Sequence, residues 1–263
     1  TFFFASYQGT RVRQRPTSQF VNVLTAKERA GDFSELSRAL ANPFGGGVFP
    51  NNQVPASLFF AGSKFFIDNH IPAPLQGRSV TNTYVSNYDD NQYLAKIDQQ
   101  VGSKLRLSGR GYWSRAYQPG SLNPRNYSEN TWIREWHNGS YVGNLQWIIS
   151  PTLLNQTIFS FNATDGPASH IYPEKGWPDL GVKITVDKYY QYHMTFNTIS
   201  TIDTGDTNNF FRKEYQAGNT TRWTRGRHSI AFGGEYHWAL GDVVNNYRAQ
   251  GQFRWQNAAG YTG

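Results

Sequence analysis

The sequence predicts an all-β fold: an antiparallel up-and-down transmembrane β-barrel, of which this chain supplies about eight strands with long extracellular loops. Three observations predict it. Segments of about ten residues alternate apolar with polar side chains, polar turns of three or four residues join these segments in pairs, and long connections separate the pairs. A strand of about ten residues with one apolar and one charged face suits an outer membrane, with the apolar face toward lipid.

The composition agrees with strands rather than helices. Of the 263 residues, 16% are aromatic and only 16% are charged, whereas soluble domains carry about a quarter charged residues. No apolar run approaches the roughly eighteen residues of a membrane helix. The absence of cysteine excludes a disulfide framework or a thiolate metal site, and no cofactor is expected.

The first hairpin has the clearest alternation. Tyr93–Val101 and Leu105–Trp113 flank a turn at residues 102–104. Period two places the apolar side chains of both segments on one face. The charged side chains fall on the other face, where we expect them to line a lumen: Lys96, Asp98, Arg106 and Arg110.

Two further hairpins follow the same design. Residues 140–149 and 154–163 flank a turn that contains Pro151, and residues 214–223 and 230–238 flank a turn that contains Gly226. Their polar positions extend the expected lumen lining with Asn144, Gln146, Gln216, Arg222, Glu235 and His237. Strict alternation favours a lumen lining over an acid–base site, because charge on the lipid face costs roughly 2–4 kcal/mol at the midplane.

The two ends of the chain are strand-like, around Phe3–Gly9 and around Phe253–Trp255, and neither has a hairpin partner. An open sheet edge in lipid leaves backbone groups unpaired at a cost of several kcal/mol each. We therefore expect residues 1–263 to form part of a larger barrel, without a plug or an N-terminal domain.

Long connections separate the hairpins, at about residues 12–82, 118–132 and 164–207, and residues 25–40 within the first look helical. Loops of this length are usually functional. Loop aromatics could stack on a sugar or a peptide, or could simply pack the loops together. These candidates for ligand contact are Trp132, Trp136, Trp177, Tyr189, Tyr190 and Tyr192.

Other chemistries find little support. The net charge of +7 comes from scattered basic residues, which disfavours a nucleic-acid partner. Hydrolase, nucleotide-binding and zinc-protease motifs are absent, so we expect no enzyme. Asp203, Asp206 and Asn208 are a weak candidate for calcium; a solvated turn is the simpler interpretation, and no metal is expected.

Several segments resemble a known family in the same order along the chain. Residues 2–9, 24–34, 52–56, 90–98, 149–155 and 223–236 are similar to the barrel portion of Oar-like TonB-dependent outer-membrane receptors. The resemblance implies a 22-stranded barrel in the bacterial outer membrane, surrounded by lipid and lipopolysaccharide. It also implies a plug that a TonB-type energy-coupling protein drives, and uptake of a ligand captured by the extracellular loops.

Two other functions remain open. The chain could belong to a surface adhesion or secretion-assisting barrel that imports nothing. Less favoured is a soluble β-sandwich that binds carbohydrate through its aromatics, in which the apolar faces would form a core. The ligand itself is unidentified, because loop aromatics with few acids suit a glycan, a peptide or a metal chelate.

Overall fold

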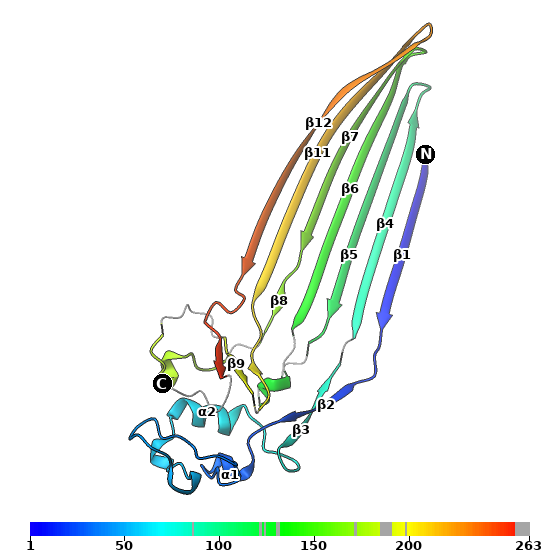
Figure 1. The fold of residues 1–263 in the computed structure, drawn as a ribbon. Coiled ribbons are helices and arrows are strands. Elements are labelled where there is room, and N and C mark those ends of the chain that lie inside the picture. The colour runs from blue at the N-terminus through cyan, green and yellow to red at the C-terminus, as the bar shows by residue number, and fades with distance from the viewer. Residues whose placement is uncertain are drawn as a thin grey trace.

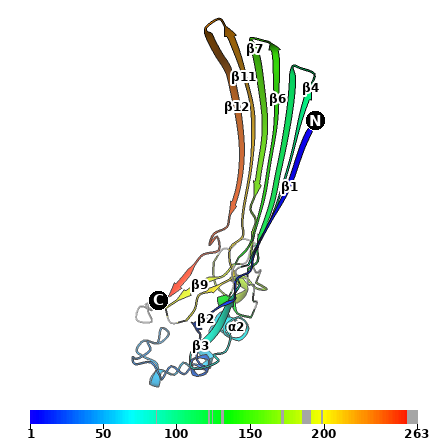
Figure 2. The same cartoon turned by 90° about the vertical axis from the view of Figure 1, so that its right-hand side faces the viewer.

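The computed structural model describes residues 1–85, 87–120, 123, 125–129, 132–170, 173–184, 191–197 and 199–255. A tall, curved antiparallel sheet dominates it (Figures 1 and 2). The long strands are β1 (Phe2–Val12), β4 (Tyr88–Val101), β5 (Leu105–Gln118), β6 (Ile133–Ser150), β7 (Leu153–Asp165), β11 (Asn208–Arg225) and β12 (His228–Asn245). They lie side by side in that order, and the short β8 (Ala168–Ser169) pairs with β6 and β11. The predicted all-β, antiparallel fold is confirmed.

Tight turns join the strands at one end of the sheet, and all long connections gather at the other (Figure 1). Gly102 between β4 and β5 has a φ of 61°, and Gly226 between β11 and β12 has a φ of 59°. Side chains other than that of glycine rarely adopt this left-handed conformation, so glycine permits these short turns. Short turns at one end and long loops at the other are the asymmetry typical of bacterial barrels, in which the turns are periplasmic and the loops extracellular.

The strand register gives the sheet two distinct faces. Tyr141 on β6 lies opposite Gly111 on β5 and Phe161 on β7, and Phe161 lies opposite Tyr215 on β11. Antiparallel neighbours in direct register point their side chains to the same side. We call this side, which also carries Trp113, Phe159, Phe232 and Tyr236, the apolar face. The opposite side is the polar face.

No part of the chain that the structure describes covers the apolar face. Phe159 is 59% exposed and Tyr236 is 68% exposed. In a β-sandwich these side chains would be packed between two sheets. The soluble carbohydrate-binding sandwich considered from the sequence is therefore wrong for this chain.

The apolar face has the height of a membrane. On β11 it extends from Trp223, beside the turns, to Lys213, beside the loops. The ten steps between these eleven residues cover about 34 Å along the strand, and a tilt of about 40° reduces this to roughly 26 Å, close to the 25 Å apolar band of outer-membrane barrels.

The end of the sheet opposite the tight turns holds a small folded region, which we call the loop domain (Figure 1). Its α-helices are α1 (Ala26–Arg29) and α2 (Ala61–Asn69), and its 3₁₀ turns are η1 (Pro50–Asn52), η2 (Ala56–Leu58), η3 (Tyr127–Glu129) and η4 (Pro178–Leu180). β2 (Thr17–Asn22) pairs with β3 (Ser79–Tyr84), and β9 (His193–Phe196) pairs with β10 (Ile202–Asp203) and β13 (Phe253–Trp255). Among the described residues, no helix has the length and apolarity to span a membrane.

Three details differ from the sequence prediction. The N-terminal strand β1, expected to lack a partner, pairs with β4 along its whole length. The strand near the C-terminal end, β13, lies in the loop domain, where it pairs with β9. It does not belong to the membrane-spanning sheet, since three residues are too few to cross a membrane. The helix expected over residues 25–40 ends at Arg29. Thr25 caps its start, but Gly31 has a φ of 88°, which a helix cannot continue through.

Candidate functional site

The ten residues expected to line a lumen all lie on the polar face. Lys96 is opposite Arg110, and Arg106 is opposite Gln146. On the last hairpin, Gln216 is opposite His237. The register extends this face across the sheet through Asp98, Asn144, Arg222 and Glu235. That the polar face encloses a lumen remains a prediction.

The charges on the polar face fall into two sectors. The sector on β4 and β5 is basic, because it carries Lys96, Arg106 and Arg110. Of these three, only Lys96 forms an ion pair among the described residues, with Asp98 at 2.8 Å. Within the described part of the chain, neither arginine forms an ion pair. On β11 and β12 the ring nitrogens of His237 lie 3.6 Å from Glu214 and 3.4 Å from Glu235.

Uncharged side chains separate these two sectors on β6 and β7. The Gln156 amide donates to Asn144 at 3.4 Å, and the Ser160 hydroxyl donates to Gln216 at 3.1 Å. Such neutral amides and hydroxyls can hydrogen-bond water or a polar solute of either charge. The polar face can therefore contact anionic groups at β4–β5 and neutral groups beside them.

The loop domain is held together by an aromatic core to which all three long loops contribute. Phe66 and Trp177 both pack edge-on against Tyr192, each at 4.7 Å between ring centroids. His70 stacks on Tyr127 at 4.1 Å and 9°. Burial raises the pKa of Tyr127 to about 12. The loops therefore form one packed structure at the end of the sheet.

Two of the residues predicted to contact a ligand belong to this core. Trp177 and Tyr192 are buried in it, so they pack the loops together and present no ring to a ligand. Trp132 is half-buried, and the Arg134 guanidinium lies 4.7 Å above its ring. Trp136 belongs to β6, outside the loops, and Tyr189 and Tyr190 lie outside the described residues.

The loop domain also holds an apolar cavity that the sequence did not indicate. Its volume is about 510 Å³, within the range of ligand pockets. Phe33, Ile67, Met194, Phe196 and Trp255 are among its lining residues, and Phe196 stacks on Trp255 at 4.6 Å and 4°. These residues come from segments far apart in the sequence, so no local motif could have identified the cavity.

Both carboxylates of the weak calcium candidate, Asp203 and Asp206, bond to other protein groups, and the candidate stays a prediction. Asp203 accepts a hydrogen bond from the Gly205 amide at 2.6 Å and pairs with His193 at 2.8 Å. Asp206 accepts from the Arg248 amide at 2.9 Å. The described residues contain no group of three or more His, Cys, Asp or Glu side chains placed to hold a metal.

Comparison with known proteins gives one match. The family model described as "outer membrane beta barrel domain" matches residues 1–263. Neither the curated proteins nor the solved structures include a match to this chain.

Proposed function

We propose that this chain forms part of the wall and of the extracellular loops of a TonB-dependent receptor. The proposal starts from the family: the chain belongs to the outer membrane β-barrel domain family and so lies in the bacterial outer membrane. In this proposal the extracellular loops capture a ligand, and the ligand enters along the polar face. A plug outside residues 1–263 would close the lumen, and a TonB-type energy-coupling protein would act on that plug.

The direction of the strands supports a larger barrel. The sheet has seven long antiparallel strands, so β1 and β12 at its two edges run in the same direction. Direct closure would pair β1 with β12 in parallel, unlike every other pair of long strands in the sheet. An odd number of additional strands would allow antiparallel closure and give the even total typical of bacterial barrels.

The loop cavity is the observation that carries the receptor proposal. It lies on the extracellular side, where a ligand arrives first, and it is built on a packed aromatic core. An apolar cavity of this kind holds aliphatic or aromatic groups better than hydroxyl groups. The ligand we favour is therefore a peptide or a metal chelate with an apolar substituent, rather than an unsubstituted glycan.

The basic sector of the polar face fits such a ligand. Arg106 and Arg110 are exposed and unpaired among the described residues. A peptide carboxylate or an anionic chelate could pair with a guanidinium there. The cavity would thus bind the apolar part of the ligand, and the wall would attract its charged part during entry.

Growth experiments test this function. A strain without the gene is compared with its parent on peptides, glycans and iron chelates, each as the sole source of one nutrient. We expect loss of growth on a peptide or chelate, and the same loss when the energy-coupling protein is deleted. Unchanged growth on every compound, with lost surface attachment or secretion, would favour the adhesion or secretion-assisting barrel instead.

A matched pair of variants tests the cavity. Ser63 on α2 lines it, whereas the exposed Ser57 in η2 does not. Ser63→Phe fills the cavity and should lower uptake of the identified compound, with an unchanged amount of protein in the outer membrane. Ser57→Phe should leave uptake unchanged; equal uptake by both variants would contradict a role of the cavity in capture.

A further inference from the structure

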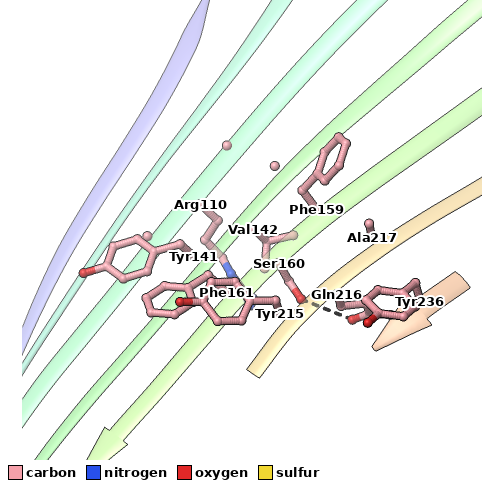
Figure 3. A pocket seen from close by; sticks show the side chains of 13 residues that line it. Arg110, Tyr141, Val142, Phe159, Ser160, Phe161, Tyr215, Gln216, Ala217 and Tyr236 are labelled. Atoms are coloured by element: carbon pink, nitrogen blue, oxygen red, sulfur yellow. Dashed lines mark hydrogen bonds between the residues drawn. The ribbon is translucent and has the colours of Figure 1, made fainter. Parts of the chain in front are cut away.

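The apolar face contains a hollow of about 600 Å³ (Figure 3). Gly109 on β5 and Gly143 on β6 lie directly opposite each other and leave its floor without side chains. Aromatic rings from four strands surround it: Tyr141, Phe159, Phe161, Tyr215 and Tyr236. Its surface is almost entirely apolar, so it suits hydrocarbon and no polar solute.

A second hollow of about 570 Å³ adjoins the first. Gly111 and Tyr141 belong to both, and Tyr7, Tyr93 and Trp113 line the remainder of the second hollow. The two hollows together extend across the sheet from β1 to β12. Several neighbouring chains of a lipid would fit this arrangement better than one compact ligand.

The depth of the hollows selects one leaflet. On β11, Ala217 and Tyr215 line the first hollow. They lie six and eight residues from Trp223, which is the turn-side end of a band of eleven residues. Tyr93 and Trp113, which line the second hollow, lie opposite each other on β4 and β5. They are nearer the loops than the residues of the first hollow. Both hollows thus face the outer leaflet, which lipopolysaccharide forms in a bacterial outer membrane.

Positive charge lies at the extracellular side of the hollows. Lys213 lies two residues nearer the loops than Tyr215, on the same face of β11. Its ammonium group lies 4.7 Å from the centroid of the Phe211 ring. It forms no ion pair within the described part of the chain. Arg115, on the same face above Trp113, donates to Glu135 at 2.9 Å. A phosphate near Lys213 would find an unpaired cation there.

We propose that the two hollows bind acyl chains of lipopolysaccharide, with Lys213 pairing with a phosphate of the same molecule. Gly109 and Gly143 create the space for the acyl chains, because they place no side chain on the floor of the first hollow. The site depends only on the outer-membrane placement of the apolar face and not on the transport proposed above.

Gly143→Leu tests the site with little risk to the fold. A Cβ atom at Gly143 would meet nothing within 4 Å, and its φ is not left-handed. The leucine would occupy the hollow. Gly234→Leu is the matched control, because Gly234 is on the same face of β12, also has nothing within 4 Å and lines neither hollow.

The measurement is native mass spectrometry of the full-length protein after exchange into detergent with purified lipopolysaccharide. We expect Gly143→Leu to weaken retention about tenfold, equivalent to about two buried methylene groups. Lys213→Gln should also weaken it, and Gly234→Leu and Lys104→Gln at the short turn should match the wild type. Should Gly143→Leu fail to assemble, Ala217→Leu fills the same hollow from β11.

Three results would overturn the proposal. Equal retention in all variants would show that the hollows hold no specific lipid. Preferential retention of phosphatidylethanolamine over lipopolysaccharide, insensitive to Lys213→Gln, would assign them to phospholipid. A change of oligomeric state in Gly143→Leu, with lipopolysaccharide retention unchanged, would assign them to contact with a second copy of the chain.

Discussion

Asn155 on β7 and Asn219 on β11 exchange two side-chain hydrogen bonds on the apolar face, each amide donating to the other's carbonyl oxygen at 3.0 Å. Thr221 and Thr157 each accept a further bond from one of these amides, at 2.8 and 2.7 Å. The four side chains thus satisfy one another on a surface that otherwise carries apolar groups. On β11, Thr221 and Asn219 lie two and four residues from Trp223, in the half of the band nearer the turns, so these hydrogen bonds satisfy polar groups inside the apolar band.

This pairing predicts strongly non-additive substitutions. Asn155→Leu removes both hydrogen bonds that Asn219 shares with Asn155 and leaves the Asn219 amide bonded to Thr157. It should lower the free energy of unfolding in a bilayer by about 1–3 kcal/mol. Asn155→Leu combined with Asn219→Leu removes both amides and should recover most of this loss. Urea titration of the full-length protein in lipid vesicles measures both effects, and additive losses would contradict reciprocal pairing.

The polar face predicts a gain of stability. Lys96 lies directly opposite Arg110, and opposed like charges destabilise strand pairing by roughly 0.2–1 kcal/mol. Arg110→Gln should therefore raise the free energy of unfolding by about this amount at low salt, and less at high salt.

Arg106→Gln is the control for this gain, because Arg106 faces Gln100 and Gln146 instead of a cation. It should give no gain. A loss of stability in Arg110→Gln would mean that the assembled barrel supplies an acidic partner to this arginine.

The loop domain predicts a pH dependence that arises from Asp206. Burial raises the pKa of this carboxyl above its usual value. As pH rises past about 4, the unfolded chain releases the proton more readily than the folded chain, so the loop domain loses stability. Asp206→Asn removes this loss and can still accept the bond from the Arg248 amide.

Hydrogen exchange of the loops measures the effect. At pH 7 the Asp206→Asn loops should be better protected than the wild type, and at pH 3 the two should agree. Asp32→Asn should act in the opposite direction, because hydrogen bonds from Ser34 and Gln53 lower the pKa of Asp32. Reduced protection in Asp206→Asn at pH 7 would contradict the assignment.

The sequence predicted the sheet because each strand carries its own signal. Alternation in β4 and β5 places Lys96 and Trp113 on opposite faces before any partner strand is known. Glycine at 102 and 226 likewise marks two of the turns locally. Strand identity, hairpin pairing and face assignment are therefore local properties of this chain.

The loop domain could not be predicted in this way. Its core joins residues from separate loops, such as Phe66 and Tyr192, and no periodic pattern connects them. Trp177 illustrates the difficulty, since a loop tryptophan that packs and one that binds a sugar look the same in sequence. The hollows of the apolar face depend on cross-strand register, which places Gly109 beside Gly143.

The central claim is that the apolar face meets lipid, and two adjacent positions on β7 test it most directly. Phe159→Arg places a charge on the apolar face and Ser160→Arg places the same charge on the polar face. The measurement is the fraction of full-length protein that assembles in the outer membrane. We predict that Phe159→Arg, at a cost of about 2–4 kcal/mol, assembles far less than Ser160→Arg. Equal assembly of the two variants would contradict the claim.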